Sequence, residues 1–279
     1  EMINSVWIFE KKLWKKMMIY ASPLLIAGLA GITNETIDRI LLKYLLPQSI
    51  NVSQEIGLYG AFYKLSIIMI LFIQTFRFAA EPFYFAQERA LNSKKIYADV
   101  MKYFVIVIAF IFLLVTTFYD FFINFLGSSY HDERGFMVVS ILLLANFFLG
   151  IYYNLSIWFK LTEKTIYGAY IAIFGALITI ALNYTLIPVI GFIGCAIATL
   201  ACYFSMTVVS FYLGNKHFPV PYNYSRILMY FLLMISIYVI LYYTNFTFIF
   251  NSLFILSFML IVYLIERPKI KESKTKKLF

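Results

Sequence analysis

Long apolar runs without a charged side chain dominate the pattern of the sequence. Residues 165–215 and 227–265 contain no Asp, Glu, Lys or Arg. A helix needs about 20 apolar residues to cross a bilayer, so each run predicts two membrane-spanning helices. The first run divides near Pro188 and Gly191, and the second near residues 244–245. The runs do not alternate between polar and apolar positions, which excludes a transmembrane β-barrel.

Applied to the whole chain, the same criterion predicts an all-α membrane protein with about eight transmembrane helices. The predicted spans are 17–46, 56–80, 100–126, 136–159, 166–187, 191–213, 226–244 and 247–265. Composition agrees, because 62% of the 279 residues are apolar and only 13% are charged, whereas soluble domains average about 25% charged residues. So few charges cannot cover a water-exposed surface, and disorder requires the opposite composition.

Basic residues are distributed very unequally between the segments that connect the spans. Eighteen of the 23 Lys and Arg residues fall on one side of the predicted membrane, Arg134 falls alone on the other, and four lie within spans. Because Lys and Arg are retained in cytoplasmic loops, both ends of the chain are predicted to be cytoplasmic. This asymmetry explains the net charge of +9, and no nucleic-acid partner is expected.

The spans and their flanks divide the chain into four segments. We expect a cytoplasmic linker at 1–16, a six-helix transmembrane lobe at 17–215, two additional transmembrane helices at 216–265 and a basic cytoplasmic tail at 266–279. The chain starts at Glu1 with a charged amphipathic stretch that lacks the pattern of a signal peptide. We therefore expect it to continue a missing N-terminal half of the same protein.

Residues that carry catalytic or metal chemistry are sparse. Cys195 and Cys202 lie on one predicted span without the further ligands that a four-ligand metal site needs. His131 and His217 fall in loops on opposite sides, and no Gly-rich phosphate loop precedes a helix. We expect no catalytic residue, no metal and no cofactor, and hence not an enzyme; transport, scaffolding and signalling remain.

Ionisable residues inside the first predicted span stand out, because a charge at membrane depth usually faces a protein interior or a water-filled cavity. Asn34, Glu35, Asp38, Arg39 and Lys43 recur at spacings of three and four residues, which places them in one polar stripe along a helix. Glu35 and Arg39 are predicted to pair across one helical turn.

The second span adds Lys64 and Arg77, and Arg77 is placed to pair with Glu81 one turn later. At 1.5 Å per residue, Lys64 lies roughly 12 Å from the outer end of its span, level with the polar stripe of the first span. The in-span charges sum to +2, which predicts a cationic cavity that binds a phosphate-type anion. The carboxylates would then couple transport to protons or sodium. For Lys43 and Arg77, near helix ends, simple snorkelling to the interface is an equal alternative.

Several segments closely resemble the C-terminal lobe of oligosaccharide (Wzx-type) flippases. These polysaccharide exporters share a superfamily with the multidrug and toxin extrusion (MATE) transporters. The likeness extends over most of 17–222 and includes the in-span pairs Asp38–Arg39 and Glu81–Pro82. The segments that carry it are 20–46, 56–87 and 142–170.

The resemblance implies two six-helix lobes, of which this chain would be the second, followed by two extra helices. It implies alternating access that moves undecaprenyl-pyrophosphate-linked oligosaccharide, an O-antigen or other surface polysaccharide repeat, across the bacterial inner membrane. The partners would be this lipid-linked oligosaccharide, the bilayer and the N-terminal half. By the same analogy, Arg39, Lys64 and Arg77 contact the anion, and Glu35 and Asp38 serve coupling or gating.

Three amides are further candidates for lining the cavity: Asn34, and Asn146 and Asn154, which share one face of the fourth span. Two other functions stay open. One is a cation-coupled multidrug exporter of the same superfamily, which would favour an acidic or aromatic pocket. The other is a non-transporting membrane component of a glycan-assembly complex.

Overall fold

The computed structural model describes residues 9–47, 50–127, 130–244 and 248–275, and every regular element within them is an α-helix. The elements are α1 (Lys11–Leu45), α2 (Val52–Gln87), α3 (Ser93–Thr117), α4 (Tyr119–Asn124), α5 (Gly135–Leu155), α6 (Ile157–Leu161), α7 (Ile166–Ile190), α8 (Phe192–His217), α9 (Tyr224–Thr244) and α10 (Phe248–Thr275). The predicted all-α class is confirmed.

Seven of the described helical segments are long and apolar enough to cross a membrane, with α5 and α6 counted together as Gly135–Leu161. With α10, which is 28 residues long, they give the eight long helices that the apolar runs predict. The chain is a multi-pass membrane protein by this architecture. Because each helix pairs its own backbone groups, such a chain can be surrounded by lipid without unpaired N–H or C=O groups.

Helix boundaries differ from the predicted spans at two connections. The span predicted at 100–126 is too long, because α3 ends at Thr117 and Phe118 leaves helical geometry before the short α4 begins. The apolar run continues through this break, so hydropathy cannot detect it. Conversely, α7 continues through Pro188 to Ile190, and the chain reverses at Gly191, whose φ of 59° suits glycine.

The two predicted terminal segments also contain helix. The first helix, α1, begins at Lys11, so the last part of the expected linker 1–16 belongs to it. The expected tail 266–279 continues α10 as far as Thr275. Residues 1–8 and 276–279 lie outside the described part of the chain.

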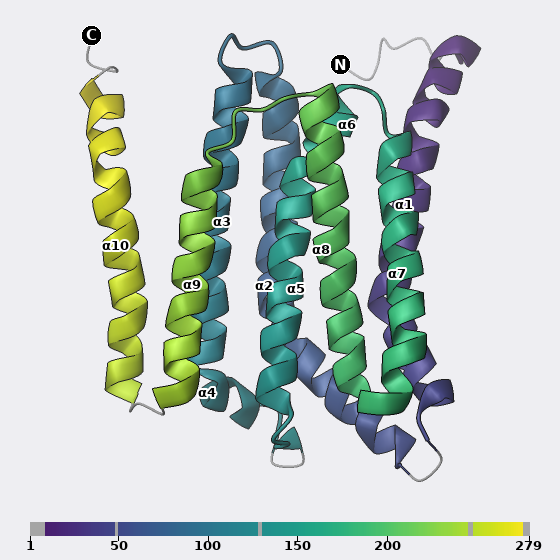
Figure 1. Ribbon diagram of the computed structural model, residues 1–279. Helices are drawn as coiled ribbons and strands as arrows, with labels where there is room; N and C mark the ends of the chain where they lie inside the picture. The colour runs from purple at the N-terminus through teal and green to yellow at the C-terminus, as the bar shows by residue number, and fades with distance from the viewer. Residues whose placement is uncertain (1–8, 48–49, 128–129, 245–247, 276–279) are drawn as a thin grey trace, which may run out of the picture.

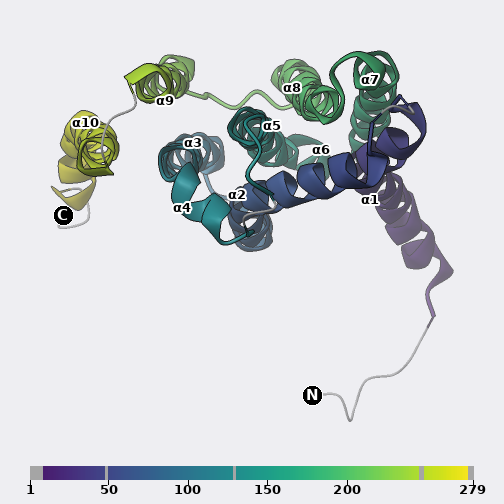
Figure 2. The same ribbon diagram turned by 90° about the horizontal axis from the view of Figure 1, so that it is seen from below.

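Six long helices form the main body, and α9 and α10 lie beside it. In the body, α5 packs against α2, α3 and α8, while α7 packs between α8 and α1. Figure 2 shows α2 running obliquely across the bundle and α9 and α10 set to one side, next to α3. The start of α1 and the end of α10 lie at the same end of the bundle, together with α6 (Figure 1).

A buried ionic cluster fastens the two added helices to α3. Glu266 of α10 accepts hydrogen bonds from Lys102 Nζ at 2.7 Å and Tyr230 Oη at 2.6 Å, and it pairs with Arg226 at 2.5 Å. Lys102 and Glu266 are 2% and 3% exposed. Two of the basic residues assigned to the cytoplasmic side by counting, Lys102 and Arg226, therefore take part in helix packing.

Candidate functional site

The buried carboxylate of Asp38 is the meeting point of four helices. It is 1% exposed and accepts hydrogen bonds from Tyr59 Oη of α2 at 2.7 Å, Asn183 Nδ2 of α7 at 2.6 Å and Thr199 Oγ1 of α8 at 3.0 Å. The rest of α1 is largely exposed, and its buried stripe after Pro23 is Asn34, Asp38 and Leu42. The four-residue spacing of this stripe turns Asp38 towards α7.

The groups around Asp38 leave polar atoms free for a small ligand. All three donors are uncharged, so an ionised carboxylate can accept every one of them. Both amide atoms of Asn34 and the Oδ1 atom of Asn183 are buried without a hydrogen-bond partner. Unpaired buried polar groups are rare and require an explanation. Oxygen atoms of this kind, next to a carboxylate, suit a proton or a small hard cation.

Next to this cluster lies a cavity of about 640 Å³ between α1, α2, α5, α6, α7 and α8. Its polar wall includes Asn34, Glu35, Gln74, Arg77, Glu81, Ser156 and Lys160. Its aromatic wall includes Tyr20, Phe85, Tyr152, Tyr153, Phe159 and Tyr203. The volume and the mixture of aromatic surface with a few converging charges are typical of ligand pockets.

Two cations of the cavity share one carboxylate oxygen. Oε1 of Glu81 lies 2.5 Å from Lys160 Nζ and 3.7 Å from Arg77 Nε. The Arg77 guanidinium carbon also lies 4.7 Å from the centre of the Tyr153 ring, a cation–π contact that orients it. The Arg77–Glu81 pair predicted from the sequence is confirmed.

The charges that line the cavity balance. Glu35 and Glu81 oppose Arg77 and Lys160, so the lining that the structure describes is not the net +2 expected from the in-span residues. Glu81 lies between the two cations, at a place where an anionic ligand would find both of them. An anion that displaced Glu81 would gain the same two partners.

The structure places the sequence-predicted residues in different surroundings. Asn34, Glu35 and Arg77 line the cavity. Arg39 lies over the Tyr63 ring at 4.8 Å, and the structure, which describes both residues, forms no ion pair between Arg39 and Glu35. The four-residue spacing allows this ion pair, but the guanidinium lies over the Tyr63 ring instead.

Lys64 is exposed on α2 and does not line the cavity. Although the sequence places Lys64 level with the polar stripe of the first span, its side chain is not part of the polar lining of this cavity. It is Tyr59, one turn earlier on α2, that reaches the polar stripe of α1 through Asp38.

Asn146 and Asn154, candidates for the cavity wall, fasten α5 to its neighbours instead. Asn146 Nδ2 donates to the carbonyl of Ser66 at 3.4 Å. Asn154 Oδ1 accepts from Tyr84 Oη at 2.8 Å, and its Nδ2 donates within α5. Both are buried, and their hydrogen bonds hold α5 against α2.

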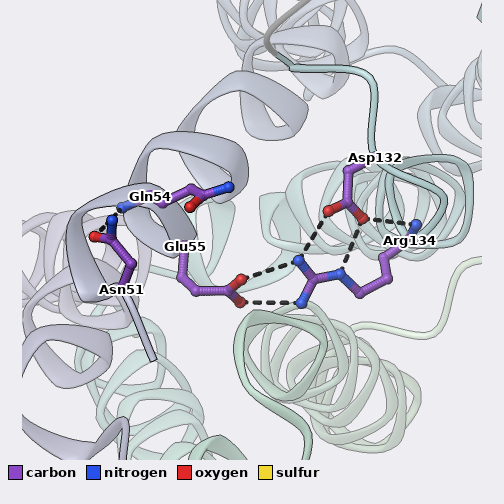
Figure 3. A network of polar contacts seen from close by, with 5 residues as sticks. All are labelled: Asn51, Gln54, Glu55, Asp132 and Arg134. Carbon is purple, nitrogen blue, oxygen red and sulfur yellow. Dashed lines mark hydrogen bonds and ion pairs between the residues drawn. The ribbon is translucent and has the colours of Figure 1, made fainter. Parts of the chain in front are cut away.

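At the other end of the bundle, Arg134 joins three segments (Figure 3). It binds both carboxylate oxygens of Glu55 in α2 at 2.9 and 3.1 Å and contacts Asp132 through its side chain and backbone. Its guanidinium also covers the ring of Phe192 at the start of α8, at 4.3 Å. Hydrogen bonds from Arg134 lower the pKa of Asp132 below its usual value, so Asp132 stays ionised at neutral pH.

Four residues of the site were not recognised in the sequence: Tyr59, Asn183 and Thr199 around Asp38, and Lys160 in the cavity. Asn183 lies in the middle of a charge-free run, and an amide at that depth indicates a hydrogen bond to another helix. Tyr59 and Thr199 are common in such helices and carry no signal of their own. Lys160 was counted as a loop cation, and only the fold brings it to Glu81.

Comparison of the chain with protein-family models, with curated proteins and with solved structures found no significant match.

Proposed function

We propose that this chain is part of a transporter that flips an undecaprenyl-pyrophosphate-linked oligosaccharide across the bacterial inner membrane by alternating access. The observation that carries the proposal is the pair of cations Arg77 and Lys160 in an aromatic-lined cavity of about 640 Å³. The pair lies within segments whose sequence resembles oligosaccharide flippases. No catalytic role is proposed for any residue.

The cation pair fits the pyrophosphate of such a lipid-linked substrate. Arg and Lys bind phosphate oxygens through charge-assisted hydrogen bonds, and Glu81 occupies this place in the structure. We propose that the headgroup displaces Glu81 when it enters. The surrounding tyrosines offer flat faces and hydroxyl groups to the attached sugars.

The Asp38 cluster supports a coupling role beside the cavity. Asp38 joins α1 to α2, α7 and α8 through three hydrogen bonds, and the adjacent Glu35 lines the cavity. Protonation or sodium binding at Asp38 would change which of these helices α1 is fastened to. Such a two-state element is what couples an ion to a substrate site.

Surface glycan display by cells that depend on the intact protein tests this proposal. The double variant Arg77→Ala/Lys160→Ala should reduce display at least about tenfold, because the headgroup loses both charged partners. The matched control is Arg89→Ala/Lys95→Ala, since both residues are exposed, lie outside the cavity and are of the same types. Wild-type display by the cavity variant at normal protein levels would contradict the proposal.

The balanced charge and aromatic wall of the cavity also support the second candidate, a cation-coupled multidrug exporter. Glu35 and Glu81 would then bind a cationic drug instead of an anionic headgroup. A further variant, Glu35→Gln, separates the two functions. A drug exporter predicts that Glu35→Gln raises drug sensitivity while glycan display is unchanged.

A further inference from the structure

A second cavity, of about 420 Å³, lies at the end of the bundle opposite to α6. It is a partly open hollow where the end of α3, the short α4 and the start of α5 meet the end of α9 and the start of α10. Figure 1 shows α4, the end of α9 and the start of α10 at this same end. None of the residues that line this second cavity lines the cavity beside Asp38 or belongs to the Arg134 cluster. We call it the outer cleft.

Aromatic rings form one wall of the outer cleft. The ring of Phe136 in α5 is nearly parallel to that of Tyr238, at 8° and 6.1 Å, and to that of Tyr242, at 25° and 5.8 Å. Tyr119 of α4 meets Phe136 edge-on at 5.3 Å. Tyr242 is 52% exposed, so part of this wall is open to a ligand.

Tyr119 is held in place by its neighbours and keeps its proton. A side chain at Gly135 would collide with the Tyr119 hydroxyl, so glycine is required for this packing. Burial, with the charges of Asp120 and Asp132, raises the pKa of Tyr119 to about 12. The hydroxyl is therefore a hydrogen-bond donor at physiological pH.

Two polar side chains in the outer cleft lack a partner. Thr117 Oγ1 and Asn251 Oδ1 are buried and make no hydrogen bond, and both residues line the cleft. The other unpartnered buried side-chain atoms in the described part of the chain belong to Asn34, Thr179 and Asn183. Since buried polar atoms are almost always paired, Thr117 and Asn251 indicate a ligand that supplies both a donor and an acceptor.

We propose that the outer cleft binds one sugar residue of a neutral glycan. The C–H face of a sugar ring packs on flat aromatic rings such as Phe136 and Tyr242. Its hydroxyl groups can donate to Asn251 and exchange a hydrogen bond with Thr117. The cleft volume is that of a small-molecule pocket. This proposal rests on the chemistry of the cleft and stands whether or not the other cavity flips a lipid-linked substrate.

Other small ligands fit the outer cleft less well. None of the described residues that line it is Lys or Arg, so it has no charged partner for a phosphate. Its rings lie side by side as a wall, whereas a quaternary ammonium is usually enclosed by rings on several sides. An acyl chain would leave Thr117, Asn251 and Asp120 without hydrogen bonds.

Saturation-transfer NMR on the intact protein in lipid nanodiscs tests the proposal directly. The probes are glucose, galactose, N-acetylglucosamine and rhamnose, with choline and inorganic phosphate as competing ligand classes. At least one sugar should receive saturation from the protein. Tyr242→Ala and Asn251→Ala should each weaken that binding at least about tenfold, because each removes a ring face or an acceptor.

The matched control is Tyr184→Ala, since Tyr184 in α7 is 67% exposed and does not line the cleft. It should bind sugar as the wild type does, and so should Arg77→Ala/Lys160→Ala, which tests the other cavity alone. Binding of no sugar, binding unchanged in Tyr242→Ala, or binding of choline or phosphate in place of sugar would overturn the proposal. Thermal melting of each variant shows that lost binding is not lost folding.

Discussion

At the scale of single residues, Asp38 shows how a membrane protein retains a buried carboxylate. Removing a charge from water is expensive, and here three uncharged donors from three other helices compensate. The same hydrogen bonds bring α2, α7 and α8 to one point of α1. A residue that suits ion coupling is therefore also a packing residue, and a useful experiment has to separate these two roles.

Asp38→Ala should lower the free energy of unfolding by at least about 2 kcal/mol, because it leaves the buried donors of Tyr59 and Asn183 unpaired. Thr199 keeps the carbonyl of Cys195 as an acceptor. Asp38→Asn keeps one carbonyl acceptor and should lose less. Thermal unfolding in detergent measures both variants. Transport by Asp38→Asn should no longer respond to the driving ion, which stability alone would not explain. Asp38→Ala as stable as the wild type would contradict the buried network.

At the scale of helices, the attachment of α9 and α10 depends on the ionic cluster around Glu266. Glu266→Met would remove the buried carboxylate that lies 2.7 Å from the buried Lys102 ammonium. The other carboxylate near Lys102, that of Asp99, is 3.7 Å away and half exposed, so it compensates only weakly. Breaking a buried pair from one side costs about 3–5 kcal/mol, whereas replacing both members with apolar residues is often neutral.

Glu266→Met should therefore destabilise the intact protein strongly, and Lys102→Met/Glu266→Met should recover most of the loss. The recovery is expected because Arg226 is only partly buried and can turn to water. It stays incomplete because the buried hydroxyl of Tyr230, which also donates to Glu266, is left without this acceptor. Equilibrium unfolding with a disulfide reporter between α3 and α9 follows the attachment itself. If the double variant is less stable than the single one, the cluster is not what fastens these helices.

The number and approximate position of the long helices can be predicted from the sequence, whereas the contacts between them cannot. Apolar runs predict the number of spans, because length and hydropathy are properties of each segment alone. The break at Phe118 escaped prediction, since it interrupts the helix and not the hydrophobicity. Asp38 was identified from its depth, whereas Tyr59 and Lys160 belong to the site only because α2 and α6 approach α1 and α2 in the fold.

At the scale of the whole molecule, some charged residues form ion pairs inside the bundle and others predict its orientation in the membrane. Inside, Glu266 pairs with Lys102 and Arg226, and Glu81 pairs with Arg77 and Lys160. The uneven distribution of the remaining basic residues between the two ends is what predicts the orientation in the membrane. Both native cysteines are fully buried, so an introduced cysteine can report orientation without their removal.

Glu133→Cys and Lys95→Cys place single exposed thiols at the two opposite ends of the bundle. In spheroplasts, a membrane-impermeant maleimide should label Glu133→Cys and should reach Lys95→Cys only after the membrane is opened with detergent. The reason is that Lys95 belongs to the basic end, which is predicted to be retained in the cytoplasm. Labelling in the reverse order would invert the orientation and move the outer cleft to the cytoplasmic side. Equal labelling of both positions in closed spheroplasts would contradict any single orientation.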